Sequence, residues 1–570
     1  MSELTFIKNL LQYSKVLNNI ERYYKLKKFF ILSLVLVLFF VSSSFAAELD
    51  LSKALENGEA TKKIIVPLID GKELKVVWYV APYVAKPNRP EEQLINIYVP
   101  ENASEKSPVL FVVNNGGWFM DDYNDTVTDR AGIAIKDGVN YLTDFDTKAD
   151  TAKGRQQFSA MALKRGFVVV SYGARGRNNG ATNGEYLGHS PATATDTKAA
   201  IRYLRANKNF LKTINTDRIV VNGTSGGGAM TALIAASGNS PDFFEYLFEI
   251  GAAGITKTED GKFLSNPEIG DNIFATMSYC PITDLGHADS AYEFTYNSTR
   301  AKLFADKNLD YSDAGVSNEE IMRKSTSLKE DYAKYVNALE LKRKDGSLLT
   351  GENLEQEIIK LMKTEIDESI KEIGIEKMKA DIETSKWHGN NWLIFNDDGS
   401  YSYDFEEHKY FVAMNQKLKI APAFSNSGLY EPQQQNEDNL FGTRNESYCP
   451  FEFLSWNEDK VKNTVGKDDT GLNWEEFMKT EAGKNLALQI KMTCPFDYLS
   501  KETNVTTAPN WYVRWGMKDR DSSFALETVF YHELLNNKNI KNLNFEFAWL
   551  FPHSGNYDAK EAFAWLDSIL

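Results

Sequence analysis

Cysteine is scarce in this sequence. Only Cys280, Cys449 and Cys494 occur among the 570 residues. They lie too far apart along the chain for the paired spacing of a metal knuckle, and they allow at most one internal disulfide. We therefore expect one disulfide bond or none, and no metal site built from cysteine.

Basic residues are outnumbered by acidic ones. The chain has 64 lysines and arginines against 79 aspartates and glutamates, which gives a formal net charge of −15. Nucleic acids and anionic membrane surfaces attract proteins through lysine and arginine. The charge balance therefore disfavours both as partners and favours a neutral substrate.

The apolar run near the N-terminus is too short for a membrane-spanning helix. Residues 29–41 form a run of 13 residues, whereas a spanning helix needs about 20. Lysines 25, 27 and 28 precede the run and small residues follow it at 42–46, which is the pattern of a secretory signal. No cysteine follows at once, so a lipoprotein is disfavoured. We expect residues 1–46 to be cut off as a signal peptide, and the protein to be periplasmic, cell-surface or extracellular, with no membrane anchor.

Cleavage at that point would make the chain more acidic. It removes six basic and two acidic residues, so the formal net charge falls from −15 to −19.

The remaining chain alternates apolar strand-like runs with helical patterns, which is typical of an α/β protein with a parallel sheet. The runs expected as strands are 75–80, 94–100, 108–114, 166–172, 219–222, 272–279, 510–516 and 545–551. Residues 318–385 show helical spacing of apolar residues, and 387–456 are expected to be irregular. The fold class we expect is an α/β-hydrolase, with a catalytic domain over 47–285 and 495–570 and an inserted lid domain over 286–494.

A possible nucleophile lies at 223–227, where Gly-Thr-Ser-Gly-Gly fits G-x-S-x-G. The glycines allow a sharp strand-to-helix turn that exposes the hydroxyl of Ser225. The helix that follows directs its N-terminal N–H groups toward any anion that forms there.

An earlier glycine turn is a candidate for the other half of an oxyanion hole. The predicted strand at 108–114 runs directly into Asn-Gly-Gly-Trp at 115–118. In this position α/β-hydrolases supply a backbone N–H to the oxyanion. Here the donor would be the N–H of Gly116 or Gly117, while the alternative is an ordinary turn.

A serine nucleophile needs a base, and the base needs an acid that fixes its tautomer. Among six histidines, only His553 directly follows a late strand. Asp519 and Asp521 follow the preceding strand, and Asp284 is a rival after an earlier one. One carboxylate of the 519/521 pair is left for another task, unless it caps the helix that begins there.

Together these segments resemble the bacterial tannases of the tannase/feruloyl esterase type. The matching pieces are Gly-Thr-Ser-Gly-Gly-Gly-Ala at 223–229, Tyr-Cys-Pro-Ile-Thr-Asp-Leu at 279–285, His-Ala-Asp at 287–289, Ala-Tyr-Glu at 291–293, Pro-Ala-Phe at 422–424, Asn-Leu-Phe-Gly at 439–442, Asp-Arg-Asp-Ser at 519–522 and the C-terminal His553. The resemblance implies a catalytic triad of Ser225, Asp519 and His553, with Gly226 and Gly117 as oxyanion donors.

The same resemblance implies an acyl pocket in which Lys419, Glu437 and Asp521 hold the hydroxyls of a galloyl group. Lys417 is an alternative to Lys419, and Glu431 is an alternative to Glu437, because the segment 425–436 is longer than usual. Buried carboxylates that bind phenol hydroxyls should reject an acyl group that lacks those hydroxyls.

We therefore expect a secreted serine esterase that hydrolyses galloyl esters and gallotannins through a galloyl-enzyme intermediate. No metal or organic cofactor is implied. The nearest alternative is a feruloyl or general aryl esterase with the same triad, and an alternative from another class is a binding protein that has kept the fold without catalysis.

Overall fold

The computed structural model describes residues 49–121, 135–143, 151–311, 315–425, 437–458, 471–501 and 504–570. The expected signal peptide, residues 1–46, lies outside these ranges. Of the helices within them, none has both the length and the apolar character needed to cross a membrane.

Nine strands form the main sheet, in the order β1-β4-β5-β8-β6-β9-β12-β15-β16. The six strands from β8 to β16 in this order are parallel, and β1, β4 and β5 are joined to them by antiparallel pairing at one edge. Their bounds are β1 (Thr61–Ile65), β4 (Val76–Pro82), β5 (Leu94–Pro100), β6 (Val109–Val113), β8 (Val168–Tyr172), β9 (Ile219–Thr224), β12 (Ala275–Tyr279), β15 (Asn510–Gly516) and β16 (Asn542–Ala548).

Every run expected as a strand contributes to this sheet, with ends displaced by three residues at most. β12 begins three residues late, and β16 begins and ends three residues early, at Asn542 and Ala548, although the apolar run continues to Phe551. The chain turns at Trp549 and Leu550, and Leu550 has a φ of 48°. An apolar run alone cannot distinguish a strand from a buried turn that follows it.

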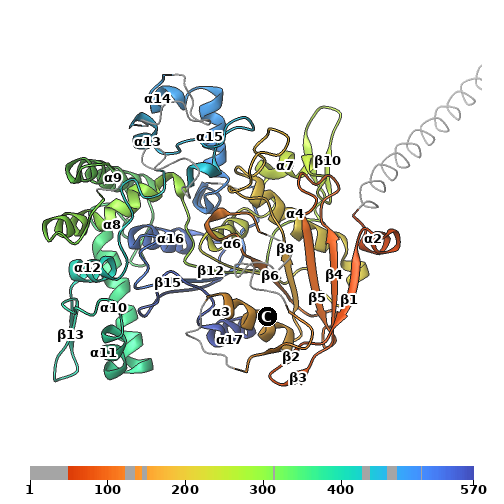
Figure 1. Ribbon diagram of the computed structural model, residues 1–570, viewed down its shortest axis with the longest axis horizontal. Helices are drawn as coiled ribbons and strands as arrows, with labels where there is room; N and C mark the ends of the chain where they lie inside the picture. The colour runs from red at the N-terminus through yellow and green to blue at the C-terminus, as the bar shows by residue number, and fades with distance from the viewer. Residues whose placement is uncertain are drawn as a thin grey trace, which may run out of the picture.

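The two faces of the sheet bury separate hydrophobic cores. In β6, Val109, Phe111 and Val113 enter one core, whereas Leu110 and Val112 enter the other. This alternation within an unbroken apolar run is expected of a parallel sheet that is covered on both faces. The first core is covered by α4 (Ala192–Ala206), α6 (Gly226–Ala236) and α16 (Phe524–Asn536), and the second by α3 (Thr151–Lys164) and α17 (Ala559–Ile569), as Figure 1 shows.

Between β12 and β15 the chain leaves the sheet for a large insertion, whose helices lie to the left and top of Figure 1. The predicted helical segment forms α9, α10 and α11. The bounds in the insertion are α8 (Leu285–Ala305), α9 (Asn318–Leu339), α10 (Leu354–Ile373), α11 (Ile375–Glu383), β13 (Leu393–Phe395), β14 (Tyr401–Tyr403), α12 (Phe405–Asn415), η4 (Glu437–Leu440), α13 (Phe453–Glu458), α14 (Trp474–Phe477) and α15 (Glu481–Lys491). We retain 286–494 as the proposed extent of this domain.

The expectation that 387–456 is irregular is wrong in part, because this stretch contains the β13–β14 hairpin and the helix α12. The helix was missed because seven of its eleven residues are buried, including His408 and Lys409. A helix enclosed in this way shows no one-sided apolar stripe in its sequence.

The smaller elements complete the α/β-hydrolase fold with its inserted, mainly helical domain, as predicted. They are α2 (Leu51–Asn57), β2 (Leu68–Ile69), β3 (Lys72–Glu73), η1 (Gly116–Trp118), β7 (Asn140–Tyr141), α5 (Lys208–Leu211), η2 (Pro241–Phe243), α7 (Phe244–Glu249), β10 (Ile255–Lys257), β11 (Phe263–Ser265) and η5 (Asp497–Lys501).

Candidate active site

Ser225 lies at the sharp turn between β9 and α6. Its backbone has φ 62° and ψ −125°, outside the regions that residues with a side chain prefer. The turn is tight enough that a Cβ on Gly223 would lie 2.5 Å from the carbonyl oxygen of Gly227. The Ser225 N–H donates to the Tyr279 carbonyl at 2.9 Å, which ties the strained turn to the neighbouring strand.

In the glycine turn after β6, the two glycines differ in whether their backbone N–H is already used. The N–H groups of Gly116, Trp118 and Phe119 donate to the carbonyls of Asn114, Asn115 and Gly116 at 2.6, 2.9 and 3.2 Å. Within the described part of the chain, the Gly117 N–H has no backbone acceptor. Between the two donors left open by the sequence, the geometry therefore favours Gly117.

Gly226 begins α6 directly against this turn. A Cβ on Gly226 would lie 2.6 Å from Gly117 N and closer still to Trp118 N. Only glycine allows this approach. The N–H of Gly226 is the first of the helix, and within the described ranges it too has no backbone acceptor. Two backbone N–H groups from turns about 110 residues apart in sequence are thus neighbours, which is the arrangement an oxyanion hole requires.

His553 and Asp519 form a direct pair. His553 Nδ1 lies 2.8 Å from Asp519 Oδ2, and the Asp519 side chain is fully buried whereas that of His553 is 17% exposed. Burial lowers the pKa of His553, but the charge and hydrogen bond of Asp519, together with the charge of Asp521, raise this pKa overall above its ordinary value. The carboxylate therefore stabilises an imidazole that takes up a proton.

The loop that carries His553 packs against the strand that carries Ser225. The Asn222 side-chain amide donates to Asn556 Oδ1 at 2.9 Å, and Gly555 approaches Thr224 so closely that a Cβ there would overlap the threonine side chain. The hydroxyl of Ser225 makes no hydrogen bond to His553 or to another described residue. The Asn222–Asn556 hydrogen bond and the close approach of Gly555 to Thr224 nevertheless bring the loop of His553 next to the turn of Ser225.

Asp284, the rival acid, belongs to a different pair. It lies 3.0 Å from His287 Nδ1, and the His287 ring stacks on Tyr335 with centroids 3.5 Å apart. Burial raises the pKa of Asp284, but the charge and hydrogen bond of His287 lower it overall. The geometry therefore associates Asp519, and not Asp284, with His553.

All three cysteines are buried, and none of them forms a disulfide with another. Cys280 lies beside the acid–base pair: its sulfur, a carboxylate oxygen of Asp519 and a ring nitrogen of His553 lie within 4.8 Å of one another. Burial raises the pKa of the Cys280 thiol well above its ordinary value, and the thiol donates to the Ser554 carbonyl at 3.1 Å. Within the structure each of these groups has a protein partner, since the thiol donates to a backbone carbonyl and Asp519 pairs with His553.

The acyl-pocket candidates Lys419, Glu437 and Asp521 lie within electrostatic reach of one another. Burial lowers the pKa of Lys419, and the charges of Glu437 and Asp521 oppose that effect. Burial raises the pKa of Asp521, but the positive charges of His553, Arg520 and Lys419 lower it overall. Lys419 thus interacts with two anions, and both Lys419 and Asp521 also interact with the imidazole of His553.

Two alternatives for these positions can be compared with the structure. Lys417 is exposed and points elsewhere, since its ammonium group contacts the Asp310 carbonyl and lies 4.6 Å from the centroid of the Tyr311 ring. Asp521 does not cap the following helix, because the N-cap of α16 is Ser523. Glu431 lies outside the described residues.

Two further residues at the site, Asp289 and Arg177, were given no role by the sequence patterns. Asp289 accepts the N–H groups of Phe424 and Ser425 at 2.6 and 3.1 Å, which fixes these two residues shortly after Lys419. Burial raises the pKa of Asp289 to about 7. Arg177 contacts both Gly117 and Glu437. Their partners lie more than 50 residues away along the chain, so no local pattern could have identified them.

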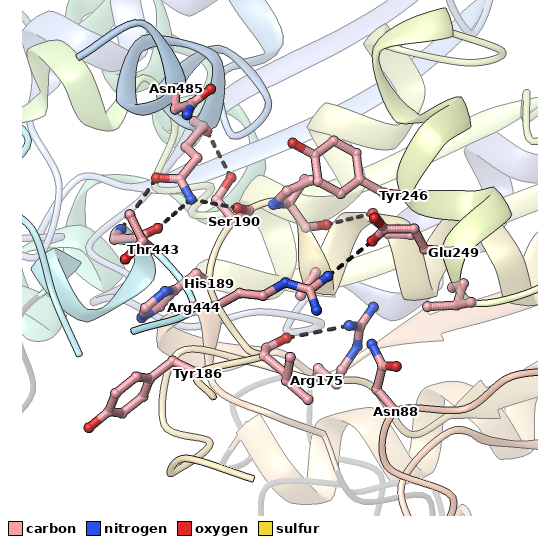
Figure 2. Close-up of a pocket in the computed structure, with 17 residues that line it drawn as sticks. Asn88, Arg175, Tyr186, His189, Ser190, Tyr246, Glu249, Thr443, Arg444 and Asn485 are labelled. Carbon is pink, nitrogen blue, oxygen red and sulfur yellow. Dashed lines mark hydrogen bonds and ion pairs between the residues drawn. The ribbon is translucent and has the colours of Figure 1, made fainter. Parts of the chain in front are cut away.

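A separate cavity of about 330 Å³ has Arg175, Glu249 and Arg444 among its lining residues (Figure 2). Arg444 reaches Glu249 there at 3.3 Å, and Arg175 forms a buried pair with Asp196 at 2.8 Å. None of the predicted catalytic or acyl-pocket residues lines this cavity, so it is not part of the candidate active site.

Comparisons with known proteins agree with this geometry. A family model described as BD-FAE matches residues 144–314. A tannin acyl hydrolase from Lactobacillus plantarum is similar in structure, with a TM-score of 0.64 and 26% identity over 90% of this chain and 97% of that chain. A tannase from Fusobacterium nucleatum gives a TM-score of 0.64 and 26% identity, over 90% and 98% of the two chains.

A ligand-bound structure is also among these neighbours. A tannin acyl hydrolase in complex with ethyl gallate gives a TM-score of 0.63 and 26% identity over 90% of this chain and 97% of that chain. No curated protein matches the sequence. The predicted resemblance is confirmed: over nine-tenths of its length the chain is a structural relative of the bacterial tannases, a carboxylic ester hydrolase of that type.

Proposed function

We propose that this protein hydrolyses galloyl esters and releases gallic acid. The observation that carries the proposal is the electrostatic contact of Lys419 with Glu437 and Asp521 next to the His553–Asp519 pair. Phenol hydroxyls donate hydrogen bonds to carboxylates, at about 1.5–3 kcal/mol each. The structural neighbour in complex with ethyl gallate supports the same class of substrate.

In the proposed reaction, Ser225 attacks the ester carbonyl while His553 accepts the proton of its hydroxyl. The carbonyl oxygen becomes an oxyanion, which the N–H groups of Gly117 and Gly226 stabilise. His553 then gives the proton to the alcohol that leaves, and a galloyl ester of Ser225 remains. Water, deprotonated by His553, hydrolyses this intermediate and restores the serine.

Acyl recognition is assigned to the three charged side chains. Glu437 and Asp521 would accept hydrogen bonds from galloyl hydroxyls, and the Lys419 ammonium would donate to one of them. The Lys419 nitrogen lies 3.9 Å from the centroid of the Phe424 ring, a contact that holds the cation in place. An acyl group without hydroxyls would leave the carboxylates without their partners, at a cost in binding.

Export is a further part of the proposal. It rests on the basic, apolar and small-residue pattern of residues 1–46. Cell fractionation and N-terminal sequencing of the mature protein would check it, with Ala47 as the expected first residue. An N-terminus within residues 1–40 would contradict it.

A feruloyl or general aryl esterase is the second candidate. The BD-FAE match favours it because that match covers Ser225 and ends at residue 314, before any of the proposed acyl-pocket residues. The two functions differ in the acyl group and share the chemistry.

The test is a panel of methyl gallate, methyl protocatechuate and methyl ferulate with the wild type and Ser225→Ala. We expect methyl gallate to give the highest kcat/KM, and Ser225→Ala to lose turnover of all three while it keeps its circular dichroism and melting temperature. A fluorophosphonate should label the wild type and not the variant. A preference for methyl ferulate would support the second candidate, and turnover by Ser225→Ala would remove serine catalysis altogether.

A further inference from the structure

Arg177 lies after β8 and fixes the oxyanion turn from two directions. Its side chain is only 4% exposed. Its Nε donates to the Gly117 carbonyl at 2.5 Å, and its backbone N–H donates to the Trp118 carbonyl at 3.0 Å. The carbonyls of Gly117 and Trp118, two of those in this turn, are therefore held by one residue.

The other end of the same guanidinium reaches the acyl pocket. Arg177 Nη2 lies 3.5 Å from Glu437 Oε1, and the guanidinium carbon lies 4.5 Å from the centroid of the Phe119 ring. Burial lowers the pKa of Arg177, while the charges of Glu437 and Asp438 act against this effect. Since the ordinary pKa of arginine is far above neutrality, the group remains a cation.

We propose that Arg177 is a positioning residue that couples recognition of the acyl group at Glu437 to alignment of the oxyanion donor at Gly117. This inference rests on the proposed function. An acyl hydroxyl that binds Glu437 fixes this carboxylate, which in turn holds the guanidinium. The guanidinium then holds the carbonyl of Gly117, on the peptide that follows the Gly117 N–H. This contact restricts rotation of the Gly117 backbone, which would turn the N–H away from the oxyanion.

The coupling requires the rigid fork of arginine. Nε and Nη2 donate to two acceptors on different segments of the chain, and the planar group transmits the position of one to the other. A lysine keeps the charge but offers a single nitrogen, so Arg177→Lys separates charge from geometry.

The experiment measures kcat and KM of the wild type, Arg177→Lys, Glu437→Gln and the double variant on methyl gallate and p-nitrophenyl acetate. Arg177→Lys should lose about ten- to a hundredfold in kcat on both esters, because a displaced oxyanion donor affects every acyl group. Glu437→Gln should raise KM and lower kcat for methyl gallate, because the bound acyl hydroxyl then no longer fixes the guanidinium. It should leave p-nitrophenyl acetate nearly unchanged. On methyl gallate the double variant should lose less than the product of the two single losses, since both act through one contact.

A control and a second measurement keep the result independent of folding. Arg444→Lys, at a surface arginine near the separate cavity, should have wild-type kinetics. Fluorophosphonate labelling of Ser225 also places an oxygen in the oxyanion hole, so Arg177→Lys should slow it by about the same factor as kcat. An unchanged melting temperature with slower labelling supports a positioning role.

Two results would overturn the inference. The first is an Arg177→Lys variant with wild-type kcat on p-nitrophenyl acetate and a wild-type rate of labelling. The second is a double variant whose loss on methyl gallate equals the product of the losses in Arg177→Lys and Glu437→Gln. Failure of the proposed function gives a different result, because the wild-type protein would then prefer another aryl ester to methyl gallate. The two single variants and the double variant are in that case compared on the preferred ester.

Discussion

The backbone N–H of Asp521 donates to Asp519 Oδ1 at 2.8 Å. The other oxygen of the same carboxylate lies 2.8 Å from His553 Nδ1. One buried acid therefore orients the base and also holds the backbone of Asp521, a residue of the proposed acyl pocket.

The first prediction follows from this double contact. Asp519→Asn should lower kcat on all esters by about 10⁴, because an amide nitrogen facing Nδ1 favours the wrong imidazole tautomer. The measurement is kcat on methyl gallate and p-nitrophenyl acetate. Asp521→Asn is the control, since at a pH above the acidic limb it should lower kcat on methyl gallate alone. An equal loss on both esters at that pH would argue against its role in acyl recognition.

The three glycines around the proposed oxyanion hole should respond differently to alanine. Gly226→Ala should lower kcat by about 10²–10³, because its Cβ would meet the backbone nitrogens of Gly117 and Trp118. Gly117→Ala should also lose activity, since φ is 63° there.

Gly116→Ala is the matched control for this series. A Cβ on Gly116 has no neighbour within 4 Å and its φ is not positive, so we expect activity near that of the wild type. Equal losses in all three variants would mean that the turn, and not a particular N–H, is needed.

The pH dependence of kcat/KM should report the charges around His553. The base must be neutral to act, so activity on p-nitrophenyl acetate should rise as the pH passes a pKa that lies above the ordinary value for histidine. The negative charge of Asp521 raises this pKa and the positive charge of Lys419 lowers it. Asp521→Asn should therefore move the acidic limb to lower pH and Lys419→Met should move it to higher pH, and shifts in one common direction would contradict the arrangement.

Lys419 and Lys417 provide a matched pair for substrate selectivity. Lys419→Met should lose about 1.5–3 kcal/mol of transition-state binding for methyl gallate, which is about ten- to a hundredfold in kcat/KM. Lys417→Met should change little, because its ammonium group contacts Asp310 on the surface. The reverse order of losses would assign the galloyl contact to Lys417.

The two buried carboxyl groups of Asp289 and Glu452 should make stability depend on pH. Burial raises the pKa of Asp289 to about 7 and that of Glu452 to about 8, and the charge of Asp289 contributes to the second shift. The folded chain then keeps protons that the unfolded chain releases above about pH 4.5, so the contribution of these groups to stability falls as the pH rises from about 4.5 to 8.

The variant Glu452→Gln tests this dependence because it cannot ionise. Its melting temperature should fall less than that of the wild type between pH 5 and pH 8. The slope is the informative quantity, since glutamine also loses one of the acceptors for the N–H groups of Leu454 and Ser455. Parallel curves for the two proteins would show that Glu452 is ionised throughout.

The sequence allowed the sheet and the serine turn to be predicted because both depend on local patterns. Apolar runs become strands wherever both faces of the sheet are covered, and the glycines around Ser225 are needed by a turn that spans only a few residues. The same reasoning placed His553 and Asp519 after neighbouring late strands, where their side chains do meet at 2.8 Å.

The contacts that cross from the sheet to the insertion could not be predicted in the same way. Arg177 and Glu437 are 260 residues apart, and their meeting depends on how the insertion folds back over the glycine turn. Asp289 likewise obtains its hydrogen-bond donors from Phe424 and Ser425, which lie 135 and 136 residues away along the chain. Sequence patterns describe what a segment does alone, whereas these groups obtain their properties from a partner.

The insertion has a consequence for how such a protein can diverge. Lys419 and Glu437 belong to the insertion between β12 and β15, whereas Ser225, Asp519 and His553 are held by loops of the sheet. On the proposed function, replacements within the insertion alter which acyl group is accepted and leave the bond-breaking chemistry as it was inherited. New substrate ranges can therefore arise within this lineage without passing through an inactive ancestor.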